Sequence, residues 1–131
     1  MQSLRLSLAG AVILAMLGGP GGVVLAQAEE PAVAAPPQLT SGLEYGADPK
    51  QVIHVYELEP RAEPRPAVVF FHGGGLIYGT PLQDMVWARQ IAEQGYVTFL
   101  AGYRLFEQFD GTNPWPAQLE DAQQAIQWVR A

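Results

Sequence analysis

Three consecutive glycines, Gly73, Gly74 and Gly75, follow His72 directly after the apolar run Ala67–Phe71. Glycine loses more backbone entropy on folding than other residues do, so three together need a physical reason. Glycine also allows positive φ angles and a close approach of a ligand to the backbone. The N–H groups of such a loop can face a developing negative charge, and one such donor contributes about 3 kcal/mol in a transition state. The glycines therefore indicate either an oxyanion site or a tight turn.

Few other residues of the chain could carry covalent or metal chemistry. The 131 residues include no Cys, which excludes disulfides, thiolate metal sites and a thiol nucleophile. The histidines are His54 and His72 alone, too few for a His-rich metal cage. We interpret His54 as a packing residue of a strand. We expect no metal and no cofactor.

The charge balance limits the partners of the protein. The chain has 7 Lys and Arg against 13 Asp and Glu, a net charge of −6. Binding to a phosphate backbone requires clustered basic residues, whereas those of this chain are scattered. We therefore expect no nucleic-acid partner.

Hydrophobic periodicity predicts the elements that position the glycine loop. We expect strands at Val52–Leu58, Ala67–Phe71 and Tyr96–Ala101, and helices from about Pro81 to Gln94 and from Pro116 onward. Because Ala67–Phe71 is apolar without alternation, we expect it to be a central strand buried on both faces. The order strand, helix, strand is typical of a parallel crossover unit, so the fold class is α/β, with a parallel central sheet flanked by helices.

Both expected helices carry recognisable signals. Thr80 is a favourable N-cap, with Pro81 at the first helical position and Gln83 three residues after the cap, and Gly95 ends the helix. In the second helix, apolar residues recur at helical spacing at Leu119, Ala122, Ile126 and Val129.

Several of these segments together resemble a known family. They are Val68–Gly75, then Gly79, then Tyr103-Arg104-Leu105, and then Pro116-Ala117-x-x-Glu120-Asp121-Ala122-x-x-Ala125-Ile126-x-Trp128-Val129. In this order they resemble the HGGG-type carboxylesterases and lipases of the α/β-hydrolase superfamily, of the hormone-sensitive-lipase-like or BD-FAE-like kind. The resemblance covers about Val52 to Ala131.

The resemblance implies roles for several residues. Gly74 and Gly75, together with Gly73, would donate N–H groups to the oxyanion formed from a small-molecule ester. His72 would shape this loop and would not be the catalytic base. Arg104 and Asp121 would form a structural pair that fixes the loop to the second helix. Two positions depart from the family pattern: Gly102 stands where the family has an acidic residue, and Phe106-Glu107-Gln108 replaces Ala-Pro-Glu.

The catalytic triad of the family has no counterpart in the sequence. The family places its nucleophile in a Gly-x-Ser-x-Gly turn, whereas the serines here are Ser3, Ser7 and Ser41 and none has those neighbours. We therefore expect the amino-terminal part of an exported ester hydrolase, with an incomplete α/β-hydrolase domain that is inactive by itself and self-associates.

Two other interpretations stay open. Gly73, Gly75 and Gly79 form a loose Gly-x-Gly-x-x-x-Gly after a strand, as in a nucleotide-binding module, but Gly102 stands where that fingerprint has an acidic residue. The chain could also be a non-catalytic binding or structural remnant of the fold.

The amino terminus has the features of a signal peptide. Arg5 precedes the apolar run Leu6–Leu17, which at about 12 residues is too short for a membrane span, and Ala26-Gln27-Ala28 is a small-x-small cleavage site. We expect a signal peptide over residues 1–28, cleavage after Ala28 and a secreted or periplasmic protein with no stable membrane span. We expect a Pro/Ala-rich linker over residues 29–45, followed by the α/β domain over residues 46–131.

Overall fold

The computed structural model describes residues 35–131, which form one folded unit. The expected signal peptide, its cleavage site and residues 29–34 of the expected linker lie outside the described residues. None of the helices within residues 35–131 has the length and apolar character needed to cross a membrane.

A four-stranded sheet forms the centre of the unit, with the order β1-β2-β4-β3. Strand β2 pairs antiparallel with both β1 and β4, whereas β3 and β4 are parallel. The last residues of the parallel pair, Phe71 and Ala101, lie opposite each other. The loop after β3 therefore begins beside the segment that follows β4. The strands are β1 (Gln38–Glu44), β2 (Val52–Glu57), β3 (Ala67–Phe71) and β4 (Val97–Ala101).

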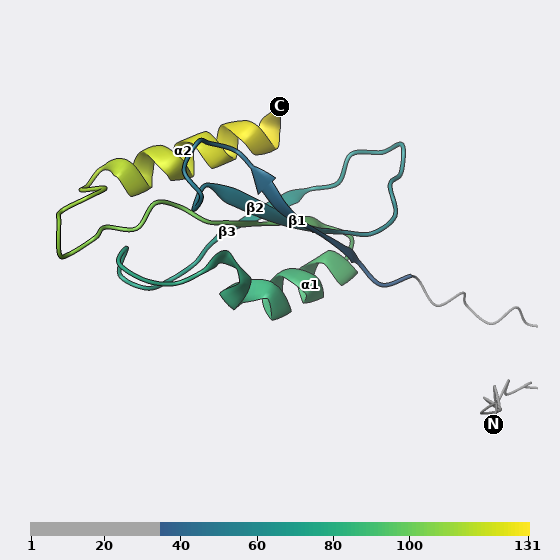
Figure 1. Ribbon diagram of the computed structural model, residues 1–131. Helices are drawn as coiled ribbons and strands as arrows, with labels where there is room; N and C mark the ends of the chain where they lie inside the picture. The colour runs from purple at the N-terminus through teal and green to yellow at the C-terminus, as the bar shows by residue number, and fades with distance from the viewer. Residues whose placement is uncertain (1–34) are drawn as a thin grey trace, which may run out of the picture. The chain divides into compact units, whose positions relative to one another are not determined.

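Helices cover both faces of this sheet, as Figure 1 shows. A short 3-10 turn, η1 (Pro81–Asp84), leads into α1 (Met85–Glu93), and α2 (Ala117–Arg130) lies on the opposite face. The crossover β3-α1-β4 and the α/β fold class are as expected. The first helix differs in one detail, because its first turn is a 3-10 helix.

Each face of the sheet has its own apolar core. Tyr56, Ala88, Ala92 and Leu100 form the core on the α1 side, and Ile53, Val55, Ala101 and Ala125 belong to the core on the α2 side. Neighbouring residues Leu100 and Ala101 thus face opposite sides, as the period of two in a strand requires. Both are fully buried, so β4 is covered on both faces, as is β2, whose Ile53 and Tyr56 belong to opposite cores.

The structure corrects the expectation for Ala67–Phe71. This segment is β3, but it lies at an edge of the sheet, and Phe71 is 36% exposed. Its apolar sequence is suited to burial on both faces, yet within residues 35–131 β3 pairs only with β4. The sheet is also mixed, because β1 and β2 enter it antiparallel.

The structure also corrects the expected linker, because residues 38–44 form β1 at the other edge of the sheet. Most of this strand is exposed and its apolar residues are Leu39 and Leu43, so it lacks the alternation that identifies a half-buried strand. Its register with β2 shifts between Thr40 and Leu43, around Gly42 with φ +74°. The bulge explains why no strand pattern is visible in the sequence.

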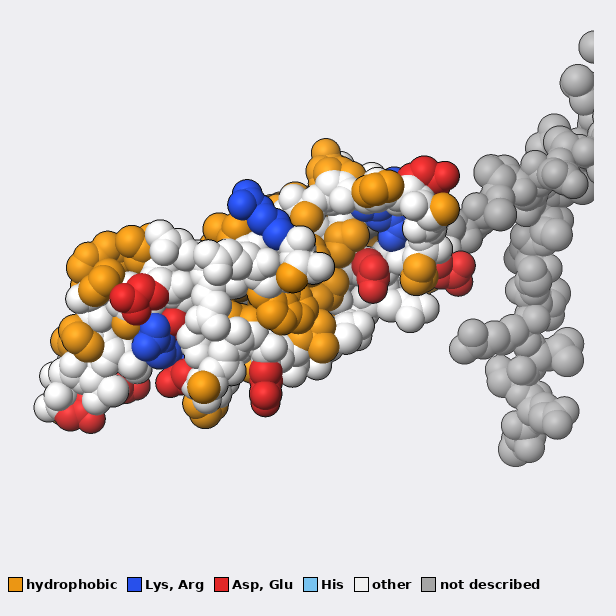
Figure 2. Space-filling view, turned by 90° about the horizontal axis from the view of Figure 1, so that it is seen from above, with side chains coloured by type: hydrophobic (Ala, Val, Ile, Leu, Met, Phe, Trp, Pro, Cys, Tyr) orange, Lys and Arg blue, Asp and Glu red, His pale blue; other side chains and the backbone are white. Residues whose placement is uncertain are grey.

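The buried face of α2 differs from the apolar stripe seen in the sequence. Ala117, Gln118, Asp121 and Ala125 are buried, whereas Leu119 is 43% exposed and Ile126 is 36% exposed. The helix is rotated so that the polar Gln118 and Asp121 point inward. Figure 2, seen from the α2 side, shows hydrophobic side chains in several groups on the surface, with charged side chains scattered between them.

Candidate functional site

The glycine loop follows β3 and adopts backbone conformations that side chains oppose. Gly74 has φ +131°, Gly75 has φ +60° and Gly79 has φ +118°. A Cβ atom at Gly74 would overlap the carbonyl oxygen of Tyr78, whereas one at Gly75 would meet no atom within 4 Å. Leu76 also has a positive φ of 68°, a strained value for a non-glycine residue and one that recurs at ligand sites.

Three successive carbonyl groups of this loop are held in place. The Tyr103 hydroxyl donates to the His72 carbonyl at 2.6 Å. The His72 ring nitrogen Nδ1 lies 2.9 Å from the Gly73 carbonyl, which can only accept, so this bond requires a proton on Nδ1. The Gly74 carbonyl accepts from the N–H groups of Ile77 and Tyr78, both at 3.2 Å.

These bonds also determine where the next N–H groups point. In a planar trans peptide the C=O and the following N–H point in opposite directions, so fixing one fixes the other. The three carbonyl bonds therefore orient the N–H groups of Gly73, Gly74 and Gly75. Within residues 35–131 none of these three N–H groups has a hydrogen-bond partner. A row of oriented, unpaired amides is suited to binding an anion.

A ring stack and a close backbone approach further define the start of the loop. The His72 ring stacks on the Tyr103 ring, with centroids 4.3 Å apart and planes 11° apart. Gly79 passes so close that a Cβ there would lie 2.5 Å from both the Gly73 oxygen and His72 Nδ1. A side chain at position 79 would therefore disrupt the bond between His72 and Gly73.

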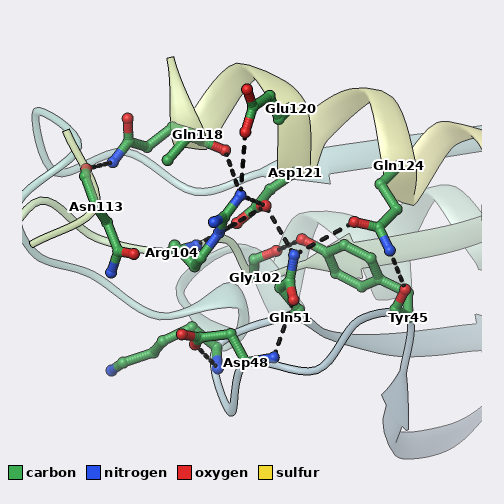
Figure 3. Close-up of polar contacts among 12 residues, drawn as sticks. Tyr45, Asp48, Gln51, Gly102, Arg104, Asn113, Gln118, Glu120, Asp121 and Gln124 are labelled. Atoms are coloured by element: carbon green, nitrogen blue, oxygen red, sulfur yellow. Dashed lines mark hydrogen bonds and ion pairs between the residues drawn. The ribbon is translucent and has the colours of Figure 1, made fainter. Parts of the chain in front are cut away.

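A buried polar cluster lies between the segment after β4 and α2 (Figure 3). Its centre is Asp121, which is fully buried. Asp121 Oδ1 accepts from Arg104 Nη2 at 2.6 Å, and Oδ2 accepts from the Arg104 backbone N–H at 2.7 Å. Hydrogen bonding to this carboxylate raises the pKa of the Arg104 guanidinium above its usual value. The structure thus brings together the two residues that the family resemblance paired.

The turn between β1 and β2 joins the same cluster. Gln51 donates from Nε2 to Asp121 Oδ1 at 2.7 Å, and Gln124 donates from Nε2 to the Tyr45 carbonyl at 2.8 Å. The Tyr45 hydroxyl donates to the Gly102 carbonyl at 2.5 Å, and burial is the main cause that raises the pKa of Tyr45. No local sequence signal indicates Tyr45, Gln51 and Gln124, because their partners lie more than 50 residues away along the chain.

The two departures from the family pattern have structural accounts. A Cβ at Gly102 would overlap the Lys50 carbonyl oxygen, so glycine allows the turn before β2 to approach the end of β4. The loop after Leu105 has anchors of its own. The Phe106 N–H donates to the Leu76 carbonyl at 2.8 Å, and Asn113 Nδ2 donates to the Leu105 carbonyl at 3.2 Å.

A mostly apolar hollow lies beside the glycine loop. Its volume is about 420 Å³, enough for a small organic group, and its lining comprises Gly75, Leu76, Ile77, Phe106, Pro114, Trp115 and Gln118. The Gln118 side chain donates to the Asn113 carbonyl at 2.8 Å, so its polar end is already used. The hollow therefore presents mainly hydrocarbon surface to a ligand.

His54 lies in β2 and lines a hollow together with His72, Gly79 and Tyr103. It is half-buried, its Nδ1 accepts from the Gly42 N–H at 3.3 Å, and burial lowers its pKa. The pKa shift and the hydrogen bond both favour a neutral ring in the fold.

The chain is similar to esterases over most of its length. The sequence model of the BD-FAE family matches residues 53–131. No curated protein matches the chain. Among solved structures, esterase B from Lactobacillus rhamnosis is 28% identical, with a TM-score of 0.61 over 76% of this chain and 31% of that chain. A thermophilic esterase from Thermogutta terrifontis, Est2 with bound propionate, is 28% identical, with a TM-score of 0.57 over 72% of this chain and 34% of that chain.

A third similar structure is EstE7, described as a homologue of HSL and obtained from a metagenome library. It is 26% identical, with a TM-score of 0.57 over 73% of this chain and 30% of that chain. The chain thus spans about a third of the length of each of these three esterases.

Proposed function

The chain belongs to the BD-FAE family, and on this premise we propose that it forms the amino-terminal part of a serine-type carboxylic-ester hydrolase. In this proposal the N–H groups of Gly73, Gly74 and Gly75 form the oxyanion hole. The observation that carries the proposal is the row of three held carbonyls, His72 to Gly74, which orients three unpaired N–H groups at the end of a parallel strand.

The chemistry follows from where charge develops. When a nucleophile attacks the carbonyl carbon of an ester, the carbonyl oxygen gains negative charge, and the loop N–H groups bind it more strongly than the neutral ester. An interaction that grows toward the transition state raises kcat. Because the held carbonyls fix the donors beforehand, little reorganisation accompanies the reaction.

The nucleophile in this proposal lies in polypeptide outside residues 35–131. Ser41, the serine within the described range, is on β1, with β2 and β4 between it and β3. Strands are spaced about 4.8 Å apart, so Ser41 lies roughly 14 Å from β3 across the sheet and cannot reach an ester on the loop. The family resemblance implies a serine in a Gly-x-Ser-x-Gly turn, with an acid and a histidine following it.

The hollow beside Gly75 supports a small ester as the substrate. Leu76, Phe106 and Trp115 give it apolar walls next to the proposed oxyanion hole. An ester has an acyl and an alcohol group on either side of the reacting carbonyl, and one of these hydrocarbon groups would lie in the hollow.

The test compares two polypeptides on p-nitrophenyl butyrate. We expect residues 29–131 alone to hydrolyse it no faster than buffer, because a nucleophile and a base are missing. The longer polypeptide that supplies the Gly-x-Ser-x-Gly turn should hydrolyse it, and replacement of that serine by Ala should abolish the activity. A burst of one p-nitrophenol per chain from residues 29–131 would contradict the assignment.

Export belongs to the same proposal. The apolar segment and the Ala26-Gln27-Ala28 site support a secreted or periplasmic protein that begins at Glu29. Amino-terminal sequencing of the exported protein tests this. A mature form that begins at Met1 would exclude cleavage.

A further inference from the structure

Tyr103 lies where the glycine loop meets the polar cluster. It follows the end of β4, and its side chain reaches back to His72 at the end of β3. The two residues are each 5% exposed. They are joined both by ring stacking and by the hydrogen bond from the Tyr103 hydroxyl to the His72 carbonyl.

We propose that Tyr103 is a positioning residue that sets the direction of two oxyanion-hole donors, an inference that rests on the proposed function. Its hydroxyl fixes the His72 carbonyl, and peptide planarity then fixes the N–H of Gly73. Its ring holds the imidazole whose Nδ1 binds the Gly73 carbonyl, which fixes the N–H of Gly74. A single side chain thus acts on two successive peptide groups of the loop.

Tyr103 is itself held by its neighbours in the chain. On one side, the Gly102 N–H donates to the Val52 carbonyl at 2.8 Å. On the other, the Arg104 N–H donates to the buried carboxylate of Asp121 at 2.7 Å. The backbone on both sides of Tyr103 is therefore fixed to other elements, so the ring and hydroxyl have a rigid base.

The chemistry of the hydroxyl agrees with a donor role. Burial raises the pKa of Tyr103 above its ordinary value of 10, so the hydroxyl keeps its proton through neutral pH. The His72 carbonyl can only accept, which sets the direction of the bond.

The kinetic test uses Tyr103→Phe in the longer, active polypeptide. This variant keeps the ring stack and loses the hydroxyl. We expect kcat to fall about 10-fold to 100-fold. This is less than the removal of a donor would cause, because the N–H group remains but is less well oriented. KM should change by less than about 3-fold, because the N–H interaction grows as charge develops.

The matched control is Thr98→Val. It also removes a buried hydroxyl, one that donates to the Ala88 carbonyl at 3.0 Å, but it lies on β4 against α1 and away from the loop. Thr98→Val should lower thermal stability to a similar extent and leave kcat within about 2-fold, since one neutral hydrogen bond contributes similarly in both places. An equal fall in kcat in both variants would overturn the proposal.

A second measurement does not depend on catalysis. In protein labelled with 15N-glycine, Tyr103→Phe should lower the backbone order parameter of Gly73 more than that of Gly74, because the stack that holds the imidazole remains. His72→Phe keeps a stacked ring pair but lacks Nδ1, so it should lower the order parameter of Gly74 more than that of Gly73. Thr98→Val should change neither residue.

The two measurements separate the possible failures. If the longer polypeptide has no esterase activity but Tyr103→Phe still lowers the order parameter of Gly73, the proposed function is wrong and the positioning role stands. Unchanged glycine order parameters in Tyr103→Phe would overturn the positioning role, whatever the activity.

Discussion

Arg104 and Asp121 form an ion pair in which the acid is fully buried and the base is largely enclosed. The shortest contact is 2.6 Å from Nη2 to Oδ1, and the two side chains are 27% and 0% exposed. Arg104 Nε adds bonds of 2.9 Å and 3.0 Å to the two carboxylate oxygens. The pair joins the segment after β4 to α2, so the attachment of that helix depends on it.

Removal of the positive partner should therefore destabilise the fold. Arg104→Met leaves the Asp121 charge buried without its counter-ion, and we expect the free energy of unfolding to fall by about 3–5 kcal/mol, as for other broken buried pairs. Urea denaturation followed by circular dichroism measures this.

Glu120→Gln provides the control for that experiment. Glu120 is 62% exposed and lies 3.5 Å from the same arginine, so its loss should change stability by only about 0–1 kcal/mol. An equal decrease in the free energy of unfolding in the two variants would show that the buried pair stabilises the fold no more than the exposed one.

The second prediction concerns Gly74. An Ala side chain there would overlap the Tyr78 carbonyl oxygen and disfavour φ +131°, so Gly74→Ala should displace the loop. We expect kcat of the active polypeptide to fall about 10²–10³-fold, the loss typical of one displaced oxyanion donor, with a smaller change in KM. Gly74→Val should be at least as damaging, because Val is larger and stiffer.

Gly95→Ala is the matched control for Gly74→Ala. Gly95 also has a positive φ, +96°, but a Cβ there meets no atom within 4 Å and the residue lies after α1. The Gly95→Ala variant should therefore lose stability through backbone strain but keep the kcat of the wild type. An unchanged kcat in Gly74→Ala would contradict the oxyanion assignment.

The sequence predicts the elements whose patterns are local. Val52–Leu58 and Ala67–Phe71 are β-branched and aromatic runs between prolines or turns, and they form β2 and β3. Thr80, Pro81 and Gln83 indicate a helix start at the correct place, and the Thr80 N–H is bound by Gln83 Oε1 at 2.8 Å. Such signals depend only on neighbours in the chain.

Features that depend on distant partners could not be predicted in this way. Nothing near Gln51 indicates that it binds Asp121, 70 residues later, and nothing near Leu39 and Leu43 indicates a strand paired with β2. The orientation of α2 also depends on a distant partner. Its buried Asp121 binds Arg104, whereas the apolar Leu119 is exposed. In each case tertiary contacts override the local pattern.

The third prediction is a pH dependence of stability due to His54. Burial lowers its folded pKa below 6.5, and protonation would also remove the Nδ1 acceptor of the Gly42 N–H. Between the folded pKa and 6.5 the unfolded chain binds more protons, so stability increases with pH across this window. This contribution is fully present above pH 6.5 and is lost progressively as the pH falls from 6.5 through the lower folded pKa.

Thermal unfolding of wild type and His54→Gln between pH 5 and 8 measures this effect. The dependence of Tm on pH should be flatter in His54→Gln than in wild type. Thr98→Val, which removes a hydrogen bond but no titratable group, should lower Tm and keep the wild-type slope. A slope that is identical in His54→Gln and wild type would exclude the contribution of His54.

The last prediction concerns the open edge of β3. Among residues 35–131, β3 pairs only with β4, and Phe71, Trp115 and Leu119 line one apolar hollow beside it. These three side chains are 36%, 65% and 43% exposed. An unpaired strand edge next to exposed apolar surface promotes pairing with another chain. We therefore expect residues 29–131 to self-associate as their concentration increases, and Phe71→Lys to oppose this association because a charge at the edge disfavours pairing.

Sedimentation velocity over a range of concentrations tests this prediction. Phe109→Lys is the control, because Phe109 is a fully exposed aromatic residue in the loop between β4 and α2. It adds the same charge and removes the same side chain without touching the edge of β3, so its association should match that of the wild type. A monodisperse wild-type monomer at all concentrations, or equal dissociation in the two variants, would show that this edge does not drive the association.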